Sequence, residues 1–334
     1  MKLIRKYYYK IFGKLIFYLE AQKRKKINEK KSQYKLVKNF RELETAVRRI
    51  NYPNNDFNKI MSMILEDIEL FGHIVDRFYT HRQILKAITI NDNFFTDLDP
   101  KAKSYPVHPT ENYINNAIKI DTKSLFIFGM ILVNRSLLLL KMYLPDREKN
   151  MKYPMYDKIG NLYFTLRNKN DLSPIATKLK DNFLIRIKWL YAVLRFYRNE
   201  FIEHLDRGYQ QGMNFGVYND DFALSSYKCD YNENDNERIE KFRLKLEKMG
   251  VKIAGRSGGG KNLINRYYVH RLFDNIVKIP NEFLNEALDL IEDIGVNSPQ
   301  PMKIITEIES YINDLFNFMI RELDQSELAK YKEK

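Results

Sequence analysis

The chain has very little cysteine, glycine or proline. It contains 1 Cys, 13 Gly and 10 Pro among 334 residues. The single cysteine, Cys229, excludes an intramolecular disulfide and any zinc or iron–sulfur site built from several cysteines. It also fits a reducing compartment, so we expect a cytoplasmic protein. Because glycine and proline are scarce, turns should be few and elements long, which favours helices over a many-stranded β fold.

Uninterrupted apolar runs of membrane-spanning length are also missing. The most hydrophobic segment, residues 124–144, has Arg135 in its middle and is flanked by Lys123. About 17 apolar residues with an internal arginine suit a buried bundle helix better than a membrane span. Near the N-terminus, lysines break the apolar run and no small-residue cleavage site follows. We therefore expect neither a transmembrane helix nor a signal peptide there.

Positive charge is abundant but concentrated in one part of the chain. The net charge is +13, with 44% hydrophobic and 30% charged residues, as in a soluble globular protein. Residues 1–50 hold 16 Lys/Arg and 4 Glu, a balance of +12, so the rest of the chain carries only +1. This distribution indicates one surface for anionic partners on an otherwise near-neutral protein.

The basic N-terminal segment has the pattern of an amphipathic helix. Lys2, Lys6, Lys10 and Lys14 recur every fourth residue, between apolar and aromatic side chains. Three interpretations stay open: a helix packed on the protein body with solvated lysines, a helix on a membrane surface, or an arm that contacts RNA or DNA. The candidate nucleic-acid-binding residues are Lys2, Arg5, Lys6, Lys10, Lys14, Lys23, Arg24, Lys25 and Lys26.

Hydrophobic periodicity predicts a mainly α protein. We expect a helical bundle with a basic N-terminal helix, a C-terminal helical region and room for a few short strands. Ser173 and Pro174 are suited to the N-cap and first position of a helix over 175–206. The other expected helices span 39–50, 56–90, 124–144, 237–249, 280–294 and 302–323. The expected loops span 91–109, 145–172 and 208–236, and the candidate strands 251–254 and 263–269.

One short motif near the end of the 175–206 helix suggests chemistry. It reads Arg198-Asn199-Glu200-Phe201-Ile202-Glu203-His204. An arginine can hold a phosphodiester and a histidine can move a proton, so the pair can cleave RNA without a metal. On a helix the two side chains lie roughly 120° apart around the axis and about 9 Å along it. One helix cannot easily close both onto one phosphate, whereas two helices across a dimer axis can.

The bare Arg–His pair carries little weight. An arginine at this distance from one of five histidines is expected about once by chance. The alternative interpretation is that Arg198 and His204 simply complement the helix dipole and solvate the helix end. Asn199 directly after the arginine, together with the position at a helix end, makes the motif more specific than the pair alone.

The segment FYRNEFIEHLD (196–206) resembles the signature of HEPN domains. These are helical bundles with an arginine, usually a following polar residue, and a histidine near a helix end. Many are metal-independent ribonucleases of toxin–antitoxin, abortive-infection and CRISPR-associated systems. The resemblance implies that Arg198 binds the scissile phosphate, that Asn199 orients it, and that His204 is the general base or acid. Glu200 is an accessory residue, either tuning His204 or lying solvated on the helix.

The resemblance also implies a function and a domain organisation. Residues 51–215 would be a HEPN-like bundle, after a basic extension over 1–50 and before a C-terminal helical region over 236–334. The chain would be a homodimeric endoribonuclease that needs no metal or cofactor, acting in antiviral defence or as a toxin with an antitoxin or defence partner. Some family members carry a tyrosine two residues after the histidine, where a nucleotidyltransferase modifies them. Here that residue is Asp206, so we do not expect control by that route.

A function without enzymatic activity is the alternative. The chain would then be a helical protein that binds nucleic acid, or makes peripheral contact with an anionic membrane, through its basic N-terminal segment.

Two further patterns have simpler explanations than ligand binding. The stretch Gly255–Asn262 has P-loop spacing up to Lys261, but Asn262 replaces the Ser or Thr that holds Mg²⁺. A flexible glycine loop explains it better. The pairs Glu69–His73 and Glu200–His204 have the spacing of helix-surface contacts more than that of metal ligands, so we expect no metal site.

Overall fold

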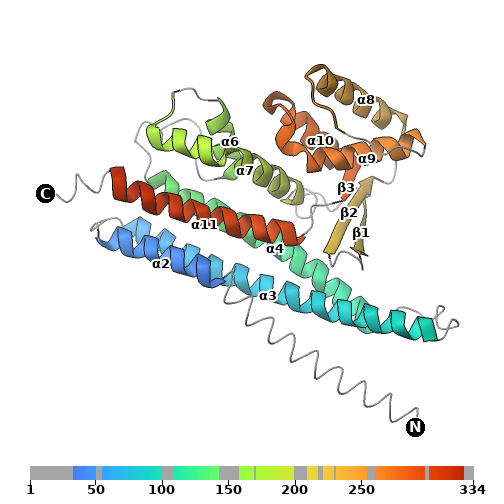
Figure 1. Ribbon diagram of the computed structural model, residues 1–334, viewed down its shortest axis with the longest axis horizontal. Coiled ribbons are helices and arrows are strands. Elements are labelled where there is room, and N and C mark those ends of the chain that lie inside the picture. The colour runs from blue at the N-terminus through green and yellow to red at the C-terminus, as the bar shows by residue number, and fades with distance from the viewer. Residues whose placement is uncertain are drawn as a thin grey trace, which may run out of the picture. The chain divides into compact units, whose positions relative to one another are not determined.

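The computed structural model confirms a mainly α protein with a helical bundle (Figure 1). It describes residues 33–49, 55–98, 109–142, 158–168, 171–198, 209–216, 221–228, 231–253, 260–297 and 301–326. The chain forms two compact units. Unit 1 comprises Met1–Phe128 and Ile312–Lys334, and unit 2 comprises Gly129–Tyr311. Helices α4 (Pro109–Met142) and α11 (Pro301–Ser326) each contain residues of both units.

Unit 1 is built from long helices. It contains α2 (Gln33–Arg49), α3 (Asn55–Leu98), the first part of α4 and the last part of α11. The α2 residues Asn39 and Phe40 join it to α11: the Asn39 amide donates to Asn313, and the Phe40 ring lies 5.9 Å from that of Phe316. The apolar core includes Leu36, Phe40, Leu43, Ile64, Ile68, Phe71, Val75, Phe78, Ile118, Leu315 and Phe316.

Unit 2 combines shorter helices with a small sheet. Strands β1, β2 and β3 form one antiparallel sheet in that order, and β3 packs against α9 and α10 (Figure 1). The helices are α6 (Ile159–Asn168), α7 (Pro174–Arg198), α8 (Glu233–Lys248), α9 (Lys261–Asp274) and α10 (Leu284–Ile294). The strands are β1 (Tyr209–Gly216), β2 (Asp221–Lys228) and β3 (Gly295–Asn297), and the 3-10 turns are η3 (Ile276–Lys278) and η4 (Asn281–Phe283).

The strands lie elsewhere than the sequence predicted. The predicted strand 263–269 is wrong, because this segment lies inside α9. Its buried residues Asn265, Tyr268, Val269 and Leu272 have helical spacing, three or four apart. Residues 251–253 form no strand either.

The hairpin of β1 and β2 occupies part of the predicted 208–236 loop. All eight residues of each strand pair one to one, from Tyr209 opposite Lys228 to Gly216 opposite Asp221. Hydrogen bonds of a sheet join main-chain groups, so a glycine-containing polar segment can form them without an apolar alternation. The glycines in this segment therefore suggested a loop although they are compatible with a strand.

Two helices extend into predicted loops. Helix α3 continues to Leu98, beyond the predicted end at residue 90, and α6 lies within the predicted 145–172 loop. In α6, Ile159, Leu162, Tyr163 and Leu166 are buried, which is one face of a helix. This helix was not predicted because Gly160 suggested a break in helical structure. A Cβ there would lie 3.1 Å from the Tyr191 ring, so a glycine allows α6 to approach α7 closely.

One described helical segment, Tyr113–Lys141 of α4, is long and apolar enough to cross a membrane, judged by length and composition alone. Half of its most apolar stretch is buried inside the protein. A core helix of a soluble protein has the same properties, so this segment is weak evidence for a membrane protein.

Candidate functional site

Helix α7 is described as far as Arg198, the candidate catalytic arginine. The start of the helix is as expected: Ser173 lies just before Pro174, and its Oγ accepts a hydrogen bond from the Ala176 amide at 3.3 Å. Apolar residues three or four apart then hold the helix in unit 2. These buried residues are Leu179, Phe183, Ile187, Leu190, Val193 and Leu194.

The last turn of α7 is fixed from two sides. Arg195 pairs with Asp289 at 2.7 Å and with Glu292 at 2.9 Å, both on α10. Phe196 and Tyr197 are almost fully buried, and the Phe196 ring meets that of Phe273 on α9 edge to face at 5.6 Å. These contacts anchor the residues immediately before Arg198 to two neighbouring helices.

Electrostatics keep Arg195 charged and occupied. Burial acts against the charge, but Glu292, Tyr191 and Asp289 outweigh it and raise the pKa of Arg195. Its guanidinium therefore binds the acidic side chains Asp289 and Glu292 of α10.

The other predicted site residues lie outside the described part of the chain. This holds for Asn199, Glu200 and His204, and for the Arg198 side chain. The segment 199–208 connects α7 to β1. The basic candidates Lys2, Arg5, Lys6, Lys10, Lys14, Lys23, Arg24, Lys25 and Lys26 also lie outside the described residues. Their roles stay predictions.

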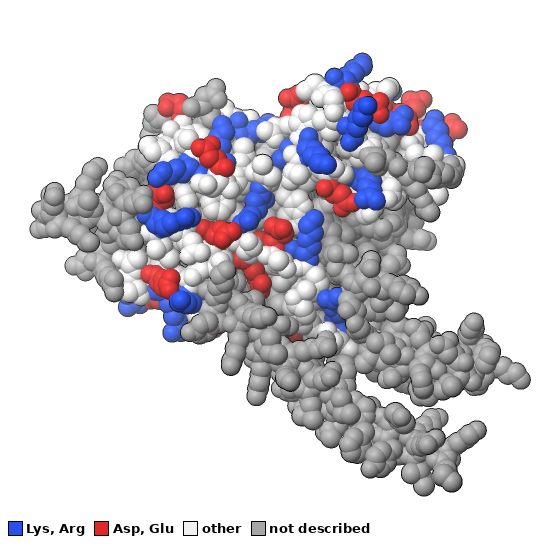
Figure 2. Space-filling model, viewed as in Figure 1, with Lys and Arg blue, Asp and Glu red and all other residues white. Residues whose placement is uncertain are grey.

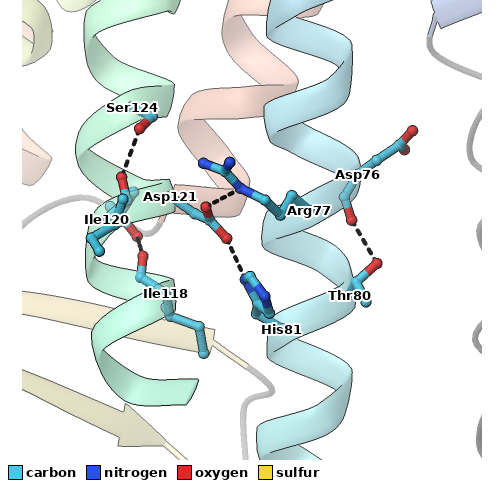
Figure 3. Close-up of polar contacts among 9 residues, drawn as sticks. Asp76, Arg77, Thr80, His81, Ile118, Ile120, Asp121 and Ser124 are labelled. Atoms are coloured by element: carbon cyan, nitrogen blue, oxygen red, sulfur yellow. Dashed lines mark hydrogen bonds and ion pairs between the residues drawn. The ribbon is translucent and has the colours of Figure 1, made fainter. Parts of the chain in front are cut away.

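A polar cluster that the sequence analysis missed joins α3 to α4 in unit 1 (Figure 3). The Asp121 carboxylate of α4 is 2% exposed, and each of its oxygens has a partner on α3. Arg77 Nε donates to Oδ1 at 2.5 Å, and His81 Nδ1 lies 2.5 Å from Oδ2. Arg77 and His81 lie one turn apart on α3, so one helix face supplies both partners.

A signal for this cluster was present in the sequence. Ile114, Ile118, Asp121 and Leu125 are buried at helical spacing on α4, so Asp121 replaces an apolar residue on a core face. A carboxylate at such a position needs cationic or hydrogen-bonding partners. The partners are 40 and 44 residues away, and nothing in the sequence indicated which side chains they would be.

The other patterns are consistent with surface or structural roles where the structure describes them. Glu69 and His73 lie exposed on α3. Within the described ranges, no group of three or more His, Cys, Asp or Glu side chains could hold a metal ion. Helix α9 begins at Lys261, and the Asn262 side chain accepts a hydrogen bond from Asn236 at 2.7 Å. Without a strand over 251–253, this region lacks the strand that precedes a P-loop.

Charge on the described surface is mixed. On the face drawn in Figure 2, basic and acidic side chains are interspersed. Several of them form ion pairs between helices, such as Lys245 with Glu286 and Arg238 with Asp293. The described face therefore agrees with the near-neutral balance of the chain after residue 50.

No protein-family model, curated protein or solved structure matches this chain.

Proposed function

We propose that the protein is a metal-independent endoribonuclease of HEPN type. The observation that carries the proposal is that the turn of α7 directly before Arg198 is anchored to α9 and α10. An anchored turn suits a residue that must hold a phosphate in a fixed place. The Asn199 and His204 that complete the motif follow immediately in the sequence.

Each motif residue has one role in the proposal. Arg198 binds the scissile phosphate and offsets the charge that builds on its oxygens. Asn199 orients Arg198 or the phosphate by hydrogen bonds. His204 is the acid–base residue, because an imidazole can gain and lose a proton near neutral pH. Glu200, one turn before His204, is an accessory residue.

The reaction uses these side chains, the RNA and solvent water. The 2′-oxygen attacks the adjacent phosphorus as its proton leaves, and the bond from phosphorus to the 5′-oxygen breaks. The 5′-oxygen leaves with a proton. His204 is the base that accepts the first proton or the acid that supplies the second, and solvent water supplies or accepts the other proton. The products are a 2′,3′-cyclic phosphate and a 5′-hydroxyl, so DNA is not a substrate.

The site would be shared between two copies of the chain. On the helix that the sequence predicts over 175–206, Arg198 and His204 lie apart, so a second copy of this helix across a dimer axis would supply the complementary residue. RNA and a second copy are the partners in this proposal, together with an antitoxin or another defence protein. Antiviral or toxin function in the cytoplasm follows from the resemblance to HEPN domains.

Cleavage of RNA in excess EDTA tests the proposal. We expect His204→Ala and Arg198→Ala each to lower the cleavage rate at least about 100-fold. His73→Ala, which removes an exposed histidine of α3, is the matched control and should cleave like the wild type. If His204→Ala cleaves as fast as the wild type, the activity does not come from this motif.

The basic segment supports a second candidate function, binding of nucleic acid or an anionic membrane without catalysis. The charge of residues 1–50 is the observation in its favour. Deleting residues 1–30 should then weaken binding both to RNA and to vesicles that contain anionic lipids. Unchanged affinity for both would remove this segment as a binding element.

A further inference from the structure

The Asp121 cluster has no part in the proposed ribonuclease site. Its three residues belong to unit 1, whereas Arg198 and His204 belong to unit 2. The cluster places an aspartate, a histidine and an arginine together, which are groups of acid–base and anion-binding sites. An explanation for it must therefore come from its own geometry.

Stability alone explains the cluster poorly. Replacing buried ion pairs by apolar side chains is often neutral or stabilising. Apolar packing is already present beside the cluster, because Phe78 and Ile118 are completely buried. Two ordinary apolar residues at positions 81 and 121 would hold α3 and α4 without the cost of removing a carboxylate from water.

Several side-chain nitrogens of the cluster form no hydrogen bond with another described residue. Arg77 engages Asp121 through Nε, its side chain is 51% exposed, and no other described residue engages its two terminal nitrogens. His81 uses Nδ1, is 21% exposed, and has no described protein partner for Nε2. Figure 3 shows the two side chains on either side of the carboxylate.

The Asp121 carboxylate determines what these free atoms can do. An ionised carboxylate only accepts hydrogen bonds, so His81 Nδ1 carries the proton. The neutral ring then has a lone pair on Nε2, and the protonated ring has a donor there. The free guanidinium nitrogens of Arg77 are donors in the planar arrangement that fits phosphate oxygens. Asp121 thus orients a histidine next to an arginine whose donors fit an anion.

We propose that Arg77 and His81, oriented by Asp121, bind a ligand that carries a phosphate and a second polar group. The Arg77 guanidinium binds the phosphate, and His81 Nε2 bonds to a neighbouring hydroxyl or second phosphate. A nucleoside phosphate has both groups, whether free or as part of a nucleic-acid strand.

Nuclear magnetic resonance of the histidine ring nitrogens tests this proposal. Full-length His204→Ala protein is used so that RNA is not cleaved, and His81→Gln identifies the His81 signals. The probes are adenosine monophosphate, inorganic phosphate, and short RNA and DNA oligomers. We expect the His81 Nε2 signal to shift with saturation on addition of adenosine monophosphate or an oligomer. Saturation by the monophosphate indicates a free nucleotide, and saturation by oligomers alone indicates a strand.

Two variants separate binding from structure. Arg77→Gln should weaken binding about tenfold or more, because it removes a charge-assisted contact to the phosphate. Arg48→Gln, at an exposed arginine of α2 paired with Glu44, should bind like the parent protein. Thermal unfolding shows whether each variant is folded. His81 signals that do not move at millimolar ligand, or equal binding by both variants, would overturn the proposal and leave the ribonuclease untouched.

Discussion

Lys188 is a cation in the interior of unit 2. Its side chain lies on α7, is buried, and donates to the main-chain carbonyls of Ile279 and, at 3.4 Å, of Val277. Burial lowers the pKa of Lys188 from 10.5 to about 8, and the nearby Arg167 charge adds to the effect. The protein therefore holds a lysine that can lose its charge near physiological pH.

This pKa predicts how stability depends on pH. The folded pKa of Lys188 lies below its unfolded value of 10.5, so between about pH 8 and 10.5 the unfolded chain binds the extra proton and folding becomes more favourable as pH rises. Below pH 8 the lysine is charged in both states and its contribution is constant. Across this pH window, the free energy of unfolding of the wild type should rise by on the order of 2 kcal/mol relative to that of Lys188→Met.

Urea unfolding at several pH values from 7 to about 10.5 measures this gain. Lys178→Met, at an exposed lysine of the same helix, is the control and should show a smaller difference from the wild type. The prediction concerns the free energy of unfolding of the wild type minus that of Lys188→Met. A decrease in this difference as pH rises would contradict the predicted direction.

At the scale of elements, the end of α7 depends on its contact with α10. Arg195 is 22% exposed and Glu292 10% exposed, so their ion pair is shielded from water. A double-mutant cycle of Arg195→Met and Glu292→Met should give a coupling free energy of about 1–3 kcal/mol. The exposed pair of Lys38 and Glu42 on α2, 3.6 Å apart, should couple by less than about 0.5 kcal/mol. Equal coupling in the two cycles would mean that the α7–α10 pair does not anchor the helix end.

What the sequence predicted about the elements was mostly local. The start of α7 was correct because Ser173 and Pro174 act on adjacent main-chain groups, and the helices of both units follow apolar periodicity. The β1–β2 hairpin was missed because its strands are polar and its stability comes from pairing between strands. The strand expected at 263–269 was wrong because its short apolar pattern also fits a helix, and packing in unit 2 favours α9.

The two candidate sites also differ in how far the sequence could predict them. The Arg198 motif could be found because its residues are neighbours in the sequence, and the structure describes α7 as far as Arg198. The Asp121 cluster could not be found, because its members come together only when α3 packs against α4. A buried position for Asp121 was predictable from the apolar spacing, but the identity of its partners was not.

At the scale of the whole molecule, the proposed ribonuclease requires two chains. If Arg198 of one copy acts with His204 of the other, mixing Arg198→Ala with His204→Ala protein produces mixed dimers with one intact site. Equal mixing should restore roughly a quarter of wild-type cleavage, because half of the dimers are mixed and each has one of its two sites intact. The rate after denaturing and refolding the mixture measures this. A site formed within one chain would give no recovery.

The chemical ends of the RNA products test the central claim most directly. Mass spectrometry of RNA incubated in excess EDTA should show 2′,3′-cyclic phosphate and 5′-hydroxyl ends with the wild type. His204→Ala should produce these ends at least about 100-fold more slowly, and the matched DNA should stay intact. Intact RNA with the wild type, or the same ends at the same rate with His204→Ala, would contradict the account.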